Sequence, residues 1–177
     1  MKNPISRRQF VGSTVTAGAA IALMPRLSRA ASPGNKVVLA VAGVRTGAPG
    51  SSGRGIELIH KFTALPGVEF KYVIDPDRRY LAPAAAIAEK AQGRAPKQET
   101  DFRRVLEDKD VDALLVTTPD HWHAPMAILA AKAGKHVYVE KPCSHSPREG
   151  EILVEVARKH GRLVQMGSQR RSIAKSI

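Results

Sequence analysis

The sequence contains a single cysteine and few aromatic residues. One cysteine excludes an intramolecular disulfide, so the fold must depend on its hydrophobic core. Cys143 has no local signature of a catalytic nucleophile, and we interpret it as a packed or bystander thiol. Aromatic residues make up 5% of the chain. This leaves no row of side chains on which the bases of a nucleic acid would stack.

Acidic residues are also scarce: the chain has 16 of them against 28 lysines and arginines, a net charge of +12. Such an excess raises the question of a nucleic-acid or anionic-membrane partner. Residues 1–30 contain five of the basic residues and none of the acidic ones, which leaves 23 basic against 16 acidic residues in the rest. Those 23 are scattered and form no basic arm, so we expect no nucleic-acid partner.

No apolar run is long enough to span a bilayer. The candidate, residues 11–24, is short and contains glycine, serine and threonine. It follows Arg7-Arg8 and precedes Ser28-Arg29-Ala30, which offers small residues three and one positions before a possible cleavage point. We therefore predict that residues 1–30 are a twin-arginine signal peptide, that the twin-arginine export machinery is a partner, and that the protein is periplasmic or extracellular.

From residue 36 onward, short β-branched segments alternate with longer alanine-rich segments. The run 37–42 is apolar almost throughout and ends at Gly43, as expected of a strand buried on both faces. The alternation predicts an α/β fold over residues 36–167, a Rossmann-type doubly wound parallel sheet of about six strands with right-handed crossovers. The predicted strands are 37–42, 68–75, 97–100, 111–117, 136–139 and 162–166, and the predicted helices are 55–65, 78–91, 101–106, 123–133 and 147–160.

A glycine-rich loop, residues 43–55, connects the first predicted strand to the first helix. Glycines at this point let the backbone approach a pyrophosphate, whose charge is met by the free N–H groups of the helix N-terminus. The spacing resembles a G-x-G-x-x-G loop stretched by an insertion. Gly43 would supply the tight turn, and Gly53 and Gly55, on either side of Arg54, the close approach.

Asp75 ends the second predicted strand, twenty residues after Gly55. A carboxylate at this point accepts hydrogen bonds from the hydroxyls of an adenosine ribose, which favours NAD. Arg78 and Arg79 lie close enough to pair with a 2′-phosphate, so NADP stays an alternative. The bland interpretation of residues 75–77 is an ordinary turn and helix cap.

Two further segments follow the fourth and fifth predicted strands: residues 117–123, with the sequence TTPDHWH, and residues 134–142, with the sequence GKHVYVEKP. They resemble the T-P-N-x-x-H and G-K-H-V-x-x-E-K-P motifs of the Gfo/Idh/MocA family, the glucose–fructose oxidoreductase and inositol 2-dehydrogenase group. The resemblance covers about residues 36–172. It departs from the family at Asp120, where asparagine is usual, and in the stretched glycine loop.

The resemblance implies an NAD(P)-dependent oxidoreductase that acts on a sugar or polyol hydroxyl. It implies that Lys141 is the catalytic acid/base, and we expect this amine in a partly desolvated pocket suited to proton transfer. Pro142 would fix the backbone after it, often through a cis bond. Together with the glycine loop and Asp75, the implied cofactor-binding residues are Gly43, Gly53, Arg54, Gly55, Asp75, Thr117, Thr118, Pro119, His121, His123, Glu140, Lys141, Pro142 and Gln169.

A metal centre is a weaker hypothesis. His121, His123, Cys143 and His145 are possible zinc ligands. Contact with the cofactor and the substrate is enough to explain histidines beside a nicotinamide site, so we expect no metal.

Family members carry a second domain that forms the substrate pocket and often the oligomer interface. Residues 168–177 resemble the start of such a domain, so we expect a truncated chain that is inactive alone and a homo-oligomeric full-length protein. Two alternatives stay open. One is a glycosidase that uses transient oxidation by bound NAD, although such relatives tend to replace the lysine found here at Lys141; the other is a non-catalytic dinucleotide-binding fragment.

Overall fold

The computed structural model describes residues 36–46 and 53–169. The expected signal peptide, the middle of the glycine-rich loop and most of the expected second-domain segment lie outside these residues. The strands are β1 (Val37–Ala42), β2 (Val68–Ile74), β3 (Lys97–Glu99), β4 (Ala113–Val116), β5 (His136–Glu140) and β6 (Val164–Gly167). The helices are α2 (Arg54–Thr63), α3 (Arg78–Gln92), α4 (Phe102–Leu106), α5 (His123–Lys132) and α6 (Pro147–His160), with a 3-10 turn, η1 (Asp120–Trp122).

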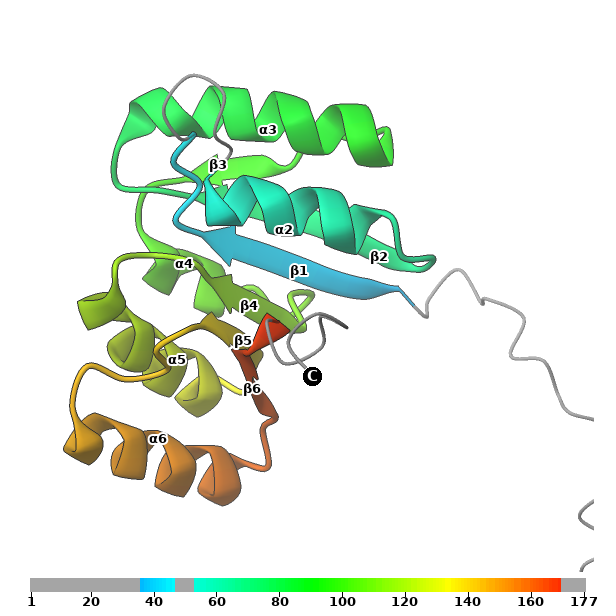
Figure 1. The fold of residues 1–177 in the computed structure, drawn as a ribbon. Coiled ribbons are helices and arrows are strands. Elements are labelled where there is room, and N and C mark those ends of the chain that lie inside the picture. The colour runs from blue at the N-terminus through cyan, green and yellow to red at the C-terminus, as the bar shows by residue number, and fades with distance from the viewer. Residues whose placement is uncertain (1–35, 47–52, 170–177) are drawn as a thin grey trace, which may run out of the picture. The chain divides into compact units, whose positions relative to one another are not determined.

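The six strands form one parallel sheet in the order β3-β2-β1-β4-β5-β6. The chain enters at β1, moves outward to β3, and then crosses back to β4 beside β1 before it continues to β6 (Figure 1). The direction of winding therefore reverses between β1 and β4, where the following loops diverge and leave a crevice at the carboxyl ends of the strands. The predicted Rossmann-type fold is confirmed.

Helices cover both faces of the sheet. In β1, Leu39 and Val41 pack into the layer made with α2 and α3, and Ala40 and Ala42 pack into the layer made with α4, α5 and α6. Figure 1 shows α2 and α3 beside each other on the first face. Because alternate residues of a strand face opposite sides, a strand covered on both faces must be apolar throughout, as the run 37–42 is.

The ends of the elements follow local chemistry. The Asp101 carboxylate accepts a hydrogen bond from the backbone N–H of Arg103 (3.1 Å) and caps α4, as predicted. Gly134 and Gly161, the predicted terminators of α5 and α6, have φ of +82° and +60°. The strand predicted from residue 111 begins only at Ala113, because the preceding residues form a turn.

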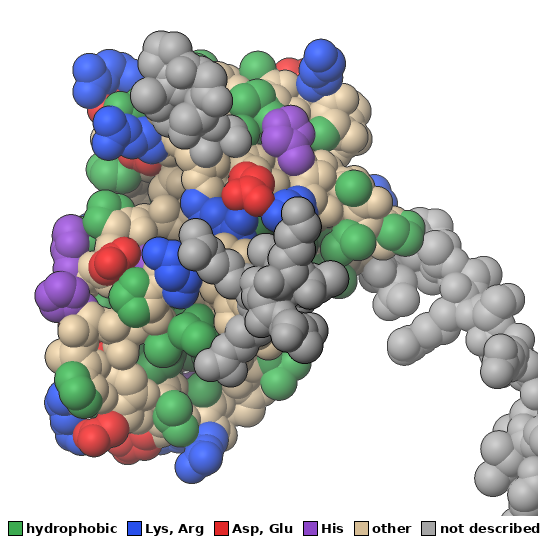
Figure 2. All heavy atoms as spheres, viewed as in Figure 1, with side chains coloured by type: hydrophobic (Ala, Val, Ile, Leu, Met, Phe, Trp, Pro, Cys, Tyr) green, Lys and Arg blue, Asp and Glu red, His purple; other side chains and the backbone are tan. Residues whose placement is uncertain are grey.

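None of the helices in the described part of the chain is long and apolar enough to cross a bilayer. Figure 2 shows acidic and basic side chains interspersed on the face that it presents.

Candidate functional site

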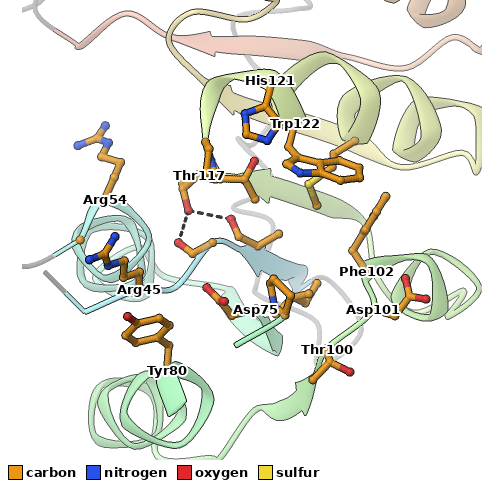
Figure 3. Close-up of a pocket in the computed structure, with 18 of the residues that line it drawn as sticks. Arg45, Arg54, Asp75, Tyr80, Thr100, Asp101, Phe102, Thr117, His121 and Trp122 are labelled. Atoms are coloured by element: carbon orange, nitrogen blue, oxygen red, sulfur yellow. Dashed lines mark hydrogen bonds between the residues drawn. The ribbon is translucent and has the colours of Figure 1, made fainter. Parts of the chain in front are cut away.

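A pocket of about 920 Å³ opens at the carboxyl ends of the central strands. We call it the strand-end pocket. Figure 3 shows Arg45 and Tyr80 toward one side of it and Trp122 and Phe102 toward the other. Its walls come from the loops after β1, β2, β3 and β4 and from η1, α4 and α5. Eight of the predicted cofactor-binding residues line it: Gly43, Gly53, Arg54, Asp75, Thr117, Thr118, Pro119 and His121.

Two glycines allow the backbone to close tightly beside this pocket. Gly43 has φ of +89°, and a Cβ there would lie 2.6 Å from the carbonyl carbon of Thr117. A Cβ on Gly55 would collide with the carbonyl oxygen of Gly43. The Thr117 hydroxyl lies 2.7 Å from that same oxygen and 2.8 Å from the carbonyl oxygen of Ala42 (Figure 3). The backbone at the end of β1 therefore packs directly against the start of α2 and against the start of the loop after β4.

This packing changes the role of Gly55. The sequence predicted that Gly55 would let the backbone approach a pyrophosphate, but the residue is buried and does not line the strand-end pocket. Its missing side chain instead lets α2 pack against the Gly43 carbonyl, the helix–strand contact served by the third glycine of a dinucleotide-binding loop. Gly43 and Gly53 remain at the pocket wall.

Asp75 lines the pocket at the end of β2 and is 7% exposed. Its Oδ2 accepts a hydrogen bond from the N–H of Val44 (3.1 Å), and its Oδ1 accepts one from the N–H of Asp77 (3.0 Å). Each carboxylate oxygen has room for a second donor. Asp75 is therefore a fixed negative charge that still has acceptor capacity toward a hydroxyl in the pocket.

The arginines near Asp75 are arranged differently from the prediction. Arg79 is 82% exposed and pairs with Asp77 (Nη2–Oδ2 2.6 Å), and neither Arg78 nor Arg79 lines the pocket. Hydrogen bonds from Arg79, with a smaller contribution from the charge of Arg45, lower the pKa of Asp77. Arg45 does line the pocket, and sequence reasoning missed it although it stands two residues after Gly43.

Arg54 and Glu140 form an ion pair across two elements. The Arg54 Nε donates to Glu140 Oε1 (2.7 Å), and its Nη1 donates to Glu57 Oε2 (2.7 Å). Burial acts to lower the pKa of Arg54, but the hydrogen bonds with Glu57, Glu140 and Tyr138 outweigh it and raise that pKa. With its amide oriented to satisfy both neighbours, Gln169 accepts from Arg54 Nη2 (3.3 Å). Arg54 thus contacts two other predicted cofactor-binding residues, Glu140 and Gln169.

Lys141 follows the last residue of β5, and its peptide bond to Pro142 is cis. The sequence predicted a partly desolvated amine, and this expectation is wrong for the described residues: Lys141 is exposed and lies outside the strand-end pocket. The reason is geometric. The residue stands beyond the strand end, where the described part of the chain provides no second wall.

His123 also differs from the prediction. It was predicted to contact the cofactor, but it is 1% exposed. Its Nδ1 lies 2.6 Å from the carbonyl oxygen of Pro142 and its Nε2 lies 2.8 Å from that of Thr118. Both ring nitrogens face backbone carbonyl oxygens, one on the loop after β4 and one on the loop after β5, and His123 does not line the strand-end pocket. The nearby Thr118 Oγ1 is buried without a hydrogen-bond partner.

The remaining lining residues were not predicted from the sequence. Trp122, the only tryptophan of the chain, belongs to the motif at 117–123 and could have been found there. Phe102 reaches the pocket from α4, and no local pattern marks it. Among residues 36–46 and 53–169, no group of three or more His, Cys, Asp or Glu side chains is placed to hold a metal ion.

The fold and the pocket together define a Rossmann-type dinucleotide-binding domain, with a glycine turn after β1, a carboxylate at the end of β2 and a crevice where the winding reverses. The sequence pattern of the oxidoreductase family with an NAD-binding Rossmann fold, the Gfo/Idh/MocA family, matches residues 46–168. The chain belongs to this family.

Curated relatives and solved structures agree with the assignment. The chain is 34% identical over 170 residues to glycosyl hydrolase family 109 protein 1 of Shewanella sp. strain ANA-3, a match that covers 86% of this chain and 37% of the relative. It is 33% identical over 169 residues to an alpha-N-acetylgalactosaminidase of Shewanella oneidensis, with the same coverage. The structure of GenD2 from gentamicin A biosynthesis in complex with NAD superposes with a TM-score of 0.62 at 27% identity, over 75% of this chain and 34% of GenD2. The chain thus spans little more than a third of the length of these proteins.

Proposed function

We propose that this domain binds a nicotinamide dinucleotide, NAD in preference to NADP, for an oxidoreductase that transfers hydride to or from a sugar or polyol hydroxyl. The observation that carries the proposal is the strand-end pocket, in which the Gly43 turn and the Asp75 carboxylate lie together at the winding reversal. The NAD complex of GenD2, a protein of the same fold, supports it.

The residues present fit such a cofactor in three places. Gly43 and Gly53 leave backbone free of side chains at the N-terminal end of α2, where a pyrophosphate meets unpaired N–H groups. Asp75 has acceptor capacity for ribose hydroxyls. Phe102 and Trp122 offer an apolar end to the pocket that suits the face of an adenine ring.

The preference for NAD rests on charge. Asp75 is buried and held by two backbone N–H groups, so it cannot swing away from a 2′-phosphate. A phosphate there would bring like charges together in a partly desolvated site, where the repulsion is strong. Arg45, one of the arginines that line the pocket, would oppose this effect.

Lys141 is the residue proposed to move the proton. When bound, the nicotinamide ring supplies hydride transfer. The Lys141 amine accepts the proton of the substrate hydroxyl as the carbon is oxidised, and returns it in the reverse direction. Because Lys141 is exposed in the described part of the chain, its desolvation depends on substrate or on a further wall.

The test is a titration of the 177-residue chain with NADH. Trp122 lines the pocket and is the only tryptophan, so its emission should fall in a saturable way as NADH, which absorbs near that emission, binds. A Trp122→Phe variant should lose the signal yet still bind NADH by calorimetry. Absence of binding by both methods up to millimolar NADH would contradict the proposal.

A second candidate is a glycosidase that oxidises and re-reduces its sugar within one turnover. The curated relatives named glycosyl hydrolase family 109 protein and alpha-N-acetylgalactosaminidase favour it. Lys141 favours the oxidoreductase, because such glycosidases tend to replace that lysine. Protein isolated from its host should be incubated with an aryl glycoside: hydrolysis without net NADH would support the glycosidase, and NADH formation with a polyol would support the dehydrogenase.

We also propose export by the twin-arginine route, which carries folded proteins and suits one that acquires its cofactor before export. Arg7-Arg8, the apolar run 11–24 and the small residues at 28–30 support this. Replacing both arginines with lysine should retain a fused reporter inside the cell, and unchanged export would refute the route. A homo-oligomeric full-length protein is a further expectation, to be checked by light scattering.

A further inference from the structure

Arg54 contacts groups on two elements of the fold, α2 and β5. It is the first residue of α2 and directly follows Gly53 in the glycine-rich loop. Its guanidinium reaches Glu57 within α2, and Glu140 at the end of β5. Its Nη2 also lies 3.5 Å from the hydroxyl oxygen of Tyr138. One side chain therefore connects the helix that begins at the glycine loop with the strand that leads into Lys141.

The carboxylate of Glu140, which accepts the hydrogen bond from Arg54, is closely packed. The Glu140 side chain is 6% exposed, and the Tyr138 hydroxyl donates to its Oε1 (3.2 Å). A Cβ on Gly167 of β6 would lie 2.6 Å from that oxygen and 2.7 Å from the Tyr138 hydroxyl. Glu140 Oε2 accepts from the backbone N–H of Lys141 (3.4 Å). The Glu140 carboxylate is thus packed against Tyr138 and Gly167, and it also accepts a hydrogen bond from the backbone of Lys141.

The positive charge of Arg54 is already matched. Two carboxylates, Glu57 and Glu140, each lie 2.7 Å from a guanidinium nitrogen. A guanidinium engaged in this way has little charge left for a pyrophosphate in the crevice. Its planar fork binds several oxygens at fixed angles, a geometry that a lysine ammonium does not reproduce.

The position of Glu140 indicates which half of a bound dinucleotide would be affected by loss of the Arg54–Glu140 ion pair. Asp75 lies on β2, on one side of β1, and Glu140 lies on β5, beyond β4 on the other side. A dinucleotide bound across the crevice with its adenosine ribose at Asp75 therefore extends its nicotinamide half toward β4 and β5.

We propose that Arg54 is a positioning residue rather than a phosphate ligand. It holds Glu140, and through Glu140 the turn into Lys141, at a fixed place relative to the glycine loop. Replacing Arg54 therefore weakens binding of the nicotinamide half of the dinucleotide alone. This inference rests on the proposed dinucleotide-binding function.

The experiment compares NADH with ADP-ribose, which carries the same adenosine, pyrophosphate and second ribose but no nicotinamide. Dissociation constants for the 177-residue chain come from calorimetry. Arg54→Met and Glu140→Gln should each weaken NADH by about 5- to 10-fold relative to ADP-ribose, the size of a contact-pair coupling. The double variant should lose little more than the larger single loss, and Arg54→Lys should recover only part of it.

The matched control is Arg148→Met, which removes an exposed arginine from an ion pair with Glu151 on α6 and should leave both affinities unchanged. Equal weakening of NADH and ADP-ribose by Arg54→Met, with no effect of Glu140→Gln, would make Arg54 a phosphate ligand and overturn the inference alone. If the parent chain binds neither ligand, the proposed function fails and the inference with it. Circular dichroism identifies a variant that does not fold; Arg54→Lys and Glu140→Gln then carry the same comparison.

Discussion

The carboxylate of Asp75 accepts a hydrogen bond from the backbone N–H of Val44 (3.1 Å) and thereby ties the end of β2 to the loop after β1. In the proposed function, the carboxylate that binds the adenosine ribose is therefore hydrogen-bonded to the loop that approaches the pyrophosphate. We expect Asp75→Asn to lower NADH affinity about 10-fold and to reduce the preference of NADH over NADPH, because a fixed charge and its charge-assisted hydrogen bonds are lost.

This preference is measured by parallel titrations with NADH and NADPH. Asp110→Asn serves as control, because Asp110 is an exposed carboxylate that does not line the pocket. An unchanged ratio of the two affinities in Asp75→Asn would show that Asp75 does not select the cofactor.

Gly43→Ala should destabilise the fold, since a Cβ there meets the Thr117 carbonyl and the residue has φ of +89°. Gly93 is the matched control: its φ is +76°, but no atom lies within 4 Å of an added Cβ. Gly93→Ala should cost about 1 kcal/mol for the backbone conformation alone, and Gly43→Ala about 3 kcal/mol or more because backbone must also move. Urea unfolding measures both; equal losses would contradict the packing argument.

Stability should depend on pH through Asp108. A hydrogen bond from Lys71 lowers the pKa of Asp108 to about 2, with smaller help from the N–H of Asp110 and the Tyr72 hydroxyl. A carboxylate whose pKa is lower in the folded state stabilises above its unfolded pKa of about 3.9 and loses that contribution as the pH falls toward 2. The urea midpoint of the parent chain should therefore fall across this window.

Asp108→Asn should flatten that part of the profile, because the replacement does not titrate. NADH affinity at neutral pH should not change, since Asp108 does not line the pocket. A variant whose midpoint falls as steeply as that of the parent would assign the acid sensitivity to other carboxylates.

Lys141→Met should leave the fold and the NADH affinity of the 177-residue chain almost unchanged, within about twofold, as expected for an exposed side chain outside the pocket. In protein isolated from its host, the same change should abolish oxidation of the polyol substrate. The comparison uses calorimetry for binding and NADH formation for turnover. Full activity without the lysine would exclude it as the acid/base.

Several features could be predicted because they depend on local order. The apolar run 37–42, the glycine after it and the alternation of strands and helices led to the correct fold. The motif at 117–123 identified part of the pocket wall, and the caps at Asp101 and Gly161 followed from the short-range chemistry of helix ends.

Other features depend on neighbours that are distant in the sequence. Arg78 and Arg79 looked suited to a phosphate, but Arg79 pairs with Asp77, and Arg45 lies in the pocket. His123 looked like a ligand residue within its motif. The residue is buried, and its ring nitrogens face two carbonyl oxygens on the loops after β4 and β5, which only the packed sheet brings together.

The sequence by itself determined the fold class, the family and the edge of the sheet at which the site lies, because periodicity, glycine positions and strand ends are properties of consecutive residues. Only the tertiary structure decided which side chains are free to meet a ligand. Arg54 and Glu140 are 86 residues apart, and the local sequence around neither residue indicates that the two form an ion pair. Side-chain availability depends on which charges and carbonyl groups the fold places within hydrogen-bonding distance, and here those groups come from different strands.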